Sequence, residues 1–149
     1  MTRKTRDPLL FRFLNEVGII EQLARTRLER VLPDELKMSH FVLLNHLARQ
    51  GGDWSPARLA SAFQVTKGAI TNTVQRLESR GLVKVVPDPG DGRGKLVSLT
   101  AAGRDVREQC VRRTRPLLAE LEAELGRQRF ERTLPVLEDV RRYLDEDRQ

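Results

Sequence analysis

Two helix-start signals stand close together in the middle of the chain, and both are followed by segments of helical character. Ser55 is a helix-capping residue, and Pro56 follows it at the first helical position. Thr66 is the second cap, and Gly81 ends the helix that it begins. Because the residues between the two helices leave room only for a tight turn, this stretch predicts a helix-turn-helix.

The segment that follows the helix-turn-helix predicts a β-hairpin with a long tip. Two β-branched runs, LVKVV and KLVSL, are separated by PDPGDGRG. We expect the glycines Gly90, Gly92 and Gly94 to let this tip approach a groove wall without a side-chain clash. Arg93 would be delivered at the tip. Asp91 would orient an arginine, either Arg93 or one from the preceding helix.

Longer helices are expected on both sides of this centre. The first occupies 8–32, and a second is capped by Ser39 and ended by Gly51. Two more fill 101–146 and are separated at Gly126. Their apolar residues recur at spacings of three and four, but the stripes are too long for the small centre to cover. We expect the terminal helices to cover each other and to meet a second copy of the chain.

The predicted fold is therefore mainly α with a small β-hairpin wing, in a single domain over 1–149. Residues 33–100 form the winged helix-turn-helix lobe, and the N- and C-terminal helices over 8–32 and 101–146 form the dimerisation region. The chain has one cysteine and no apolar run of about 20 residues, so we expect no disulfide and no membrane partner. These features favour a cytoplasmic protein near the nucleoid.

The charge distribution favours a polyanionic partner. The formal net charge is +6, and residues 55–95 hold seven basic and three acidic residues, a local net of +4. Arg76 and Lys95 belong to this basic set. The second helix of the motif has an inward face and an outward face. Inward we expect Ala69, Ile70, Val74 and Leu77; outward we expect Lys67, Gly68, Thr71, Asn72 and Gln75.

The outward face has side chains that can read DNA. The amides of Asn72 and Gln75 present a paired donor and acceptor to an adenine edge, and Thr71 can bond a base or contact a thymine methyl. Gly68 lets the backbone approach a phosphate. In the hairpin, Arg93 has the charge and reach to enter a narrow minor groove. The alternative is that this helix face and the hairpin tip are only solvated surface.

The segment SPARLASAFQVTKGAITNTVQRLESRGLVKVVPDPGDGRGKLVSLTAAGRD resembles the winged-helix core of the MarR (multiple antibiotic resistance regulator) family. The resemblance is carried by the helix-turn-helix, RLESRGLV, the D-x-R wing and VSLTAAG, and the flanking helices extend it over nearly the whole chain. It implies a homodimeric transcriptional repressor whose two lobes straddle a pseudo-palindromic operator in double-stranded DNA. It also implies release by a small aromatic or phenolic effector.

The resemblance also implies roles for individual residues. Arg76 lies in the RLE segment, where a structural role is equally open, and Asp91 and Arg93 fall on the wing positions. The residues that would meet bases and adjoining phosphates are Thr66, Lys67, Thr71, Asn72 and Gln75.

Other residues suggest no further chemistry. Cys110 lies on an apolar stripe, where a small hydrophobic role is favoured over redox sensing. His40 and His46 are about 240° apart around one helix and cannot share a metal from one face. Trp54 is expected to anchor the base of the wing.

No catalytic, cofactor or metal signature is present, so we expect no enzyme. The alternative function is a winged-helix module for protein interaction without specific DNA binding; an activator or a regulator without a ligand also remains open.

Overall fold

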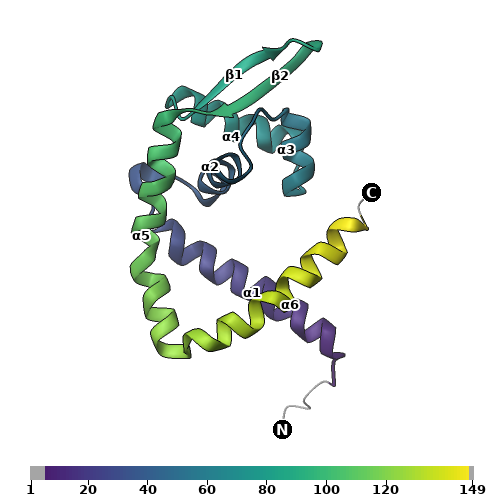
Figure 1. Ribbon diagram of the computed structural model, residues 1–149, viewed down its shortest axis with the longest axis vertical. Coiled ribbons are helices and arrows are strands. Elements are labelled where there is room, and N and C mark those ends of the chain that lie inside the picture. Colours follow the sequence, from purple (N-terminus) through teal and green to yellow (C-terminus); the bar gives the residue numbers. More distant parts are fainter. Residues whose placement is uncertain (1–5, 148–149) are drawn as a thin grey trace. The chain divides into compact units, whose positions relative to one another are not determined.

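The computed structural model describes residues 6–147 and is mainly helical with one antiparallel hairpin, which confirms the predicted fold class. Two compact units are distinguished, one reaching to Arg113 and the other starting at Thr114, and one long helix contributes to both. In chain order (Figure 1), the elements are α1 (Leu9–Glu29), the 3-10 turn η1 (Pro33–Glu35), α2 (Met38–Gln50), α3 (Pro56–Phe63), α4 (Lys67–Ser79), β1 (Val83–Asp88), β2 (Asp91–Leu99), α5 (Ala101–Leu125) and α6 (Arg127–Glu146).

The first unit has a dense apolar core built from its short helices. α2 contributes Leu43, Leu44 and Leu47, each at most 1 % exposed, and α3 and α4 contribute the fully buried Leu59 and Leu77. These residues recur at helical spacing, so each helix turns one apolar stripe inward. The core therefore fixes how α3 and α4 are presented to solvent.

The hairpin is attached to this core through Trp54. The backbone N–H of Trp54 donates to the carbonyl of Val97 at 2.9 Å, and the N–H of Val97 donates back at 2.8 Å. The guanidinium of Arg58 lies 4.1 Å from the centre of the Trp54 ring. These contacts confirm that Trp54 anchors the base of the wing.

The hairpin strands are longer than predicted and the turn is shorter. β1 reaches Asp88 and β2 begins at Asp91, so Arg93 lies inside β2 rather than at the tip. The side chain of Asp88 closes the turn by accepting the N–H of Gly90 at 2.9 Å. The register shifts between Pro87 and Asp88, so Gly92, Arg93 and Gly94 have no residue of β1 opposite them and form an irregularity next to the turn.

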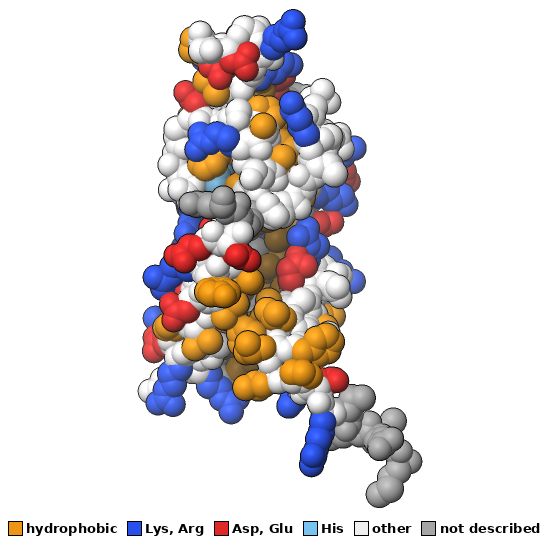
Figure 2. Space-filling model, turned by 90° about the vertical axis from the view of Figure 1, so that its right-hand side faces the viewer, with side chains coloured by type: hydrophobic (Ala, Val, Ile, Leu, Met, Phe, Trp, Pro, Cys, Tyr) orange, Lys and Arg blue, Asp and Glu red, His pale blue; other side chains and the backbone are white. Residues whose placement is uncertain are grey.

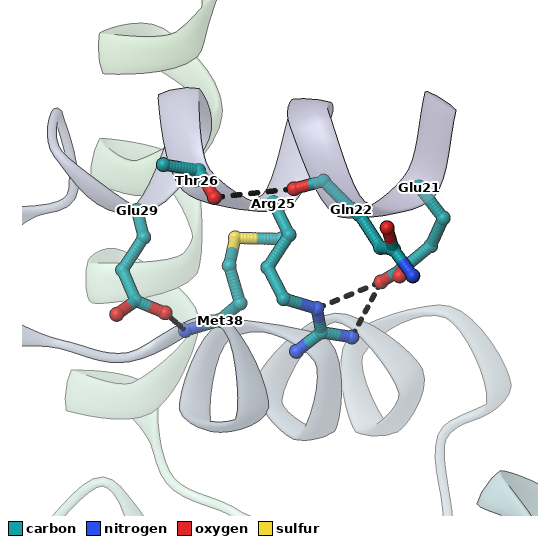
Figure 3. A network of polar contacts seen from close by, with 6 residues as sticks. All are labelled: Glu21, Gln22, Arg25, Thr26, Glu29 and Met38. Atoms are coloured by element: carbon teal, nitrogen blue, oxygen red, sulfur yellow. Dashed lines mark hydrogen bonds and ion pairs between the residues drawn. The ribbon is translucent and has the colours of Figure 1, made fainter. Parts of the chain in front are cut away.

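The start of α2 also differs from the sequence prediction. Ser39 is not the cap, because the helix already begins at Met38. Instead, the carboxylate of Glu29 in α1 accepts the N–H of Met38 at 2.8 Å, as Figure 3 shows. His40 accepts the N–H of Lys37 at 3.0 Å. A negative charge at a helix N-terminus is favourable, so the carboxyl end of α1 supplies the cap.

The predicted caps at Ser55 and Thr66 are confirmed. The hydroxyl of Ser55 accepts the N–H of Arg58 at 3.2 Å, and that of Thr66 accepts the N–H of Ala69 at 3.1 Å. Gly51 has a φ of 64° and ends α2 as expected. These are local contacts within three residues, which is why the sequence predicts them.

The terminal helices leave their apolar residues exposed. Neither α1 nor α6 contains a buried residue. Among residues 6–147, all large exposed hydrophobic side chains except Val65 lie in α1, α5 or α6, and Figure 2 shows many such side chains at the surface. Over the same range, no helix has the length and apolar character of a membrane span.

Candidate nucleic-acid interface

An open groove of about 650 Å³ lies between the start of α3, the outer face of α4 and the hairpin. Six of the ten residues singled out from the sequence line it. From α4 these are Lys67, Thr71 and Gln75, and from the hairpin they are Asp91, Arg93 and Lys95. The fold therefore brings the predicted helix face and the predicted wing residues to one surface.

The two faces of α4 divide largely as predicted. Ile70, Val74 and Leu77 are buried, whereas Ala69 is exposed and does not belong to the inward stripe. All the predicted reading residues of α4 are exposed. Thr71 donates its hydroxyl hydrogen to the carbonyl of Lys67 at 2.9 Å, so the oxygen remains available as an acceptor.

Four predicted residues lie outside the lining of the groove. Asn72 and Arg76 are exposed on α4, and Thr66 is held at its start by the capping bond. Gly68 is also in the first turn, and a Cβ added there would come no closer than 4.0 Å to the Thr66 hydroxyl. The fold does not need glycine at this position, although glycine costs about 1 kcal/mol in a helix. A close external partner is one reason to have it.

In the hairpin, Asp91 acts on the backbone. Its Oδ1 accepts the N–H of Arg93 at 3.1 Å. Between residues 6 and 147, Asp91 forms no ion pair with an arginine side chain, in contrast to the role expected from the sequence. A Cβ at Gly94 would lie 3.2 Å from the Cβ of Asp88 and 3.2 Å from Oδ2 of Asp91. Gly94 therefore gives these two aspartates room to shape the turn.

The groove itself is balanced in charge. Lys67, Arg93 and Lys95 stand against Glu78, Asp88 and Asp91, all of them lining residues. The excess positive charge of residues 55–95 is therefore carried by basic residues that do not line the groove. These are Arg58, Arg76, Arg80 and Lys84. Of these, Arg76 and Lys84 are exposed and can attract phosphates, whereas Arg80 is bound to the carbonyl of Asp34.

The start of α3 also belongs to this surface, although no pattern in the sequence indicates it. Ser55, Pro56 and Ala57 line the groove, as do the carboxylates of Glu78 and Asp88. The Ser55-Pro56 pair was visible as a helix start. Its position opposite the wing arises from the pairing of Trp54 with β2, which joins residues far apart in the sequence.

Cys110, His40 and His46 are packed against other residues of the fold. Burial raises the pKa of the Cys110 thiol to about 11, so it stays protonated in the core. Burial lowers the pKa of His40, and the charges of Arg80 and Arg76 lower it further. The ring of His46 packs edge-on against Trp54 at 4.4 Å between centroids. Within the described residues, no group of His, Cys, Asp and Glu could hold a metal ion.

Comparison with known proteins places this arrangement in a family. The model of the MarR family matches residues 35–94. The multiple antibiotic resistance protein MarR of Salmonella typhimurium is 30% identical over 109 residues, which cover 70% of this chain and 75% of that protein. The chain belongs to the MarR family. It is a DNA-binding transcriptional regulator of the winged-helix type.

Solved structures of other MarR-family regulators share its fold. A mutant of Escherichia coli MarR complexed with operator DNA has a TM-score of 0.73 and 27% identity, covering 90% of this chain and 99% of that chain. Bordetella bronchiseptica BpsR, whose DNA binding is regulated by 6-hydroxynicotinic acid, has a TM-score of 0.67 and 26% identity. That match covers 84% of this chain and 98% of BpsR.

Proposed function

We propose that this MarR-family regulator is a homodimeric, sequence-specific repressor that a small ligand releases from DNA. The observation that carries the proposal is the shared groove, where exposed residues of α4 face Arg93 and Lys95 of the hairpin. In this arrangement α4 enters the major groove and the hairpin follows the backbone into the adjacent minor groove. The operator complex of the related E. coli protein supports this mode.

Individual residues have separate roles in the proposed complex. Asn72 and Gln75 read base edges, and Thr71 contacts a neighbouring base or its methyl group. Lys67 binds a phosphate close to Gly68. Arg93 enters the minor groove, and Lys95 and Arg76 bind phosphates. Thr66 stabilises the start of α4, and Asp91 stabilises the turn of the wing.

The proposed dimer is formed by the exposed apolar residues of the terminal helices. In α1, Leu10, Ile20 and Leu23 are between 60% and 68% exposed. Such a surface is costly to leave in water, and a two-fold dimer covers the same patch on both copies. The dimer holds two α4 helices about 34 Å apart, one turn of DNA, on a pseudo-palindromic operator.

The proposed ligand is a small aromatic acid or phenol. A cavity of about 190 Å³ lies among α1, α2 and the α3–α4 turn, with apolar walls that include Val42, Phe63 and Ile70. Arg25 also lines it, and its guanidinium is held by Glu21 at 2.7 Å. An apolar cavity with one cationic group suits a flat ring bearing an acidic substituent. The regulation of BpsR by 6-hydroxynicotinic acid supports this class.

The test selects binding sites from random duplex DNA and then measures affinity at several salt concentrations. Arg93→Ala should weaken binding to every sequence and reduce the salt slope by about one. Asn72→Ala should cost about 1–3 kcal/mol at one base position and relax the preference there. Arg49→Ala, an exposed arginine of α2 outside the groove, is the matched control.

Two outcomes would contradict the proposal. Unchanged affinity in both Arg93→Ala and Asn72→Ala would remove the assigned contacts. Failure of the wild-type protein to select any sequence, with little salt dependence, would favour the protein-interaction module instead.

A further inference from the structure

The segment between α1 and α2 has an unfavourable backbone conformation. Asp34 and Glu35 have φ angles of 53° and 57°, in the left-handed region that residues other than glycine rarely adopt. Pro33 and Leu36 on either side are buried. Two consecutive residues of this kind persist only where their surroundings hold them in place.

One of the holding contacts comes from the DNA-reading helix. Nη1 of Arg80, the residue that caps the carboxyl end of α4, donates to the carbonyl of Asp34 at 2.9 Å. The two residues are 46 positions apart in the sequence. A charged donor on a backbone carbonyl is stronger than a neutral hydrogen bond. The end of α4 is thus tied to the segment that follows α1 and leads into α2.

The start of α5 is attached at the same place. The N–H of Thr100 donates to the carbonyl of Leu82 at 3.2 Å, and its hydroxyl donates to the carbonyl of Gly81 at 2.7 Å. A Cβ added at Gly103 would overlap the carbonyl oxygen of Leu82. Glycine is therefore required for α5 to pack this closely on the chain that leaves α4.

Three consecutive residues, Arg80–Leu82, thus connect the end of α4 to the segment that follows α1 and to the start of α5. We call them the α4 junction. We propose that Arg80 is a positioning residue that sets the orientation of α4 relative to α1 and α5, and thereby the distance between half-sites that the dimer prefers. The inference rests on the proposed function, because α1 and α5 belong to the proposed dimerisation region while α4 reads DNA. Arg80 acts through the linker carbonyl and not through a base.

The experiment uses the full-length protein and a palindromic duplex selected by the wild type from random DNA. Two further duplexes have the central spacer lengthened or shortened by one base pair. Arg80→Met should reduce the preference of the protein for the selected spacing by about tenfold, the size expected for loss of one charged hydrogen bond. The dependence of its DNA affinity on salt concentration should stay unchanged. Arg80→Lys should restore part of the preference, and Arg49→Met controls for the lost charge.

Three outcomes separate this role from others. If Arg80→Met lost the same affinity for all three duplexes and its salt slope fell by about one, Arg80 would contact a phosphate directly, and the inference would be overturned. An unchanged spacing preference in a folded Arg80→Met dimer would overturn it as well. If the wild type selects no sequence, the proposed function fails, and the inference fails with it.

A second measurement does not depend on DNA. The N–H of Leu36 donates to the carbonyl of Pro33 at 3.0 Å within the strained segment. In Arg80→Met, hydrogen exchange of this amide should become about tenfold faster, since local opening is no longer resisted by Arg80. The amide of Leu59, which donates to the carbonyl of Ser55 in α3, should not change. Equal rates at Leu36 in wild type and variant would overturn the inference.

Discussion

The helix-turn-helix lobe and the terminal helices have similar apolar periodicity but opposite burial. In the lobe, Leu77 of α4 is fully buried, and Leu43, Leu44 and Leu47 of α2 are at most 1% exposed. In α6, Leu134 at helical spacing from its neighbours is 55% exposed, and no residue of α1 or α6 is buried. A periodic stripe therefore indicates a face that must be covered but not what covers it. Within the lobe the chain covers its own stripes, whereas for α1 and α6 we propose a second copy.

The largest expected effect lies in the lobe. Leu77→Ala should reduce the free energy of unfolding by about 2–5 kcal/mol, because it leaves a cavity in a close-packed core. The loss should not depend on protein concentration. Leu134→Ala is the matched control in α6. Urea denaturation is measured at two protein concentrations. Leu134→Ala should lower the free energy of unfolding only slightly at the low protein concentration and more at the high one. Equal, concentration-independent losses would remove the contrast between the regions.

An intermediate effect is expected in α1. Ile20→Asp places a charge on the exposed apolar face and should raise the dissociation constant of the dimer at least about tenfold, because the charge must be desolvated on association. Sedimentation equilibrium measures this constant. Gln22→Asp adds the same charge on another side of the helix and should leave the dimer intact. A dimer unaffected by Ile20→Asp would show that α1 is not part of the interface.

The smallest effect concerns the contact that joins the two regions. The N–H of Met38, with a further contribution from Lys37, holds the pKa of Glu29 below its ordinary value of 4.5. A lowered folded-state pKa stabilises the fold above the unfolded value, and this contribution is lost as pH falls through the folded value. Glu29→Gln should cost about 0.5–1 kcal/mol at pH 7 and less near pH 3.

Urea midpoints at the two pH values measure this loss. Glu21→Gln removes an exposed carboxylate of α1 that pairs with Arg25 and is the control. A loss of the same size at both pH values would show that the charge of Glu29 does not stabilise the start of α2.

The parts that could be predicted from the sequence depend on short-range chemistry. The caps at Ser55 and Thr66 bond within three residues, and Gly51 and Gly126 end helices through their own φ angles. These signals place the helix-turn-helix and the hairpin correctly. The grouping of α4 with the wing follows from the short chain between them.

The missed features include one contact between two helices and two details of the hairpin turn. Ser39 is a good capping residue, but Glu29 from another helix occupies the start of α2 one residue earlier. Glycines around Arg93 favoured a loop, but β2 begins at Asp91 and contains Arg93 at a register irregularity next to the turn. Asp91 next to an arginine suggested a contact with its side chain, whereas the carboxylate accepts the backbone N–H of Arg93 two residues away. At Ser39 a local preference is overridden by a partner that only the fold supplies, whereas the differences in the hairpin arise within its own turn.

By itself, the sequence determined the order of elements, the inward stripe of α4 and the residue types of the DNA-reading face, because helical periodicity and capping act over a few residues. Only the tertiary structure decided that the start of α3 shares a groove with the wing, and that Arg80–Leu82 joins α4 to the segment after α1 and to α5. These contacts link residues far apart in the chain. Their geometry depends on how the core packs, and no local pattern records it.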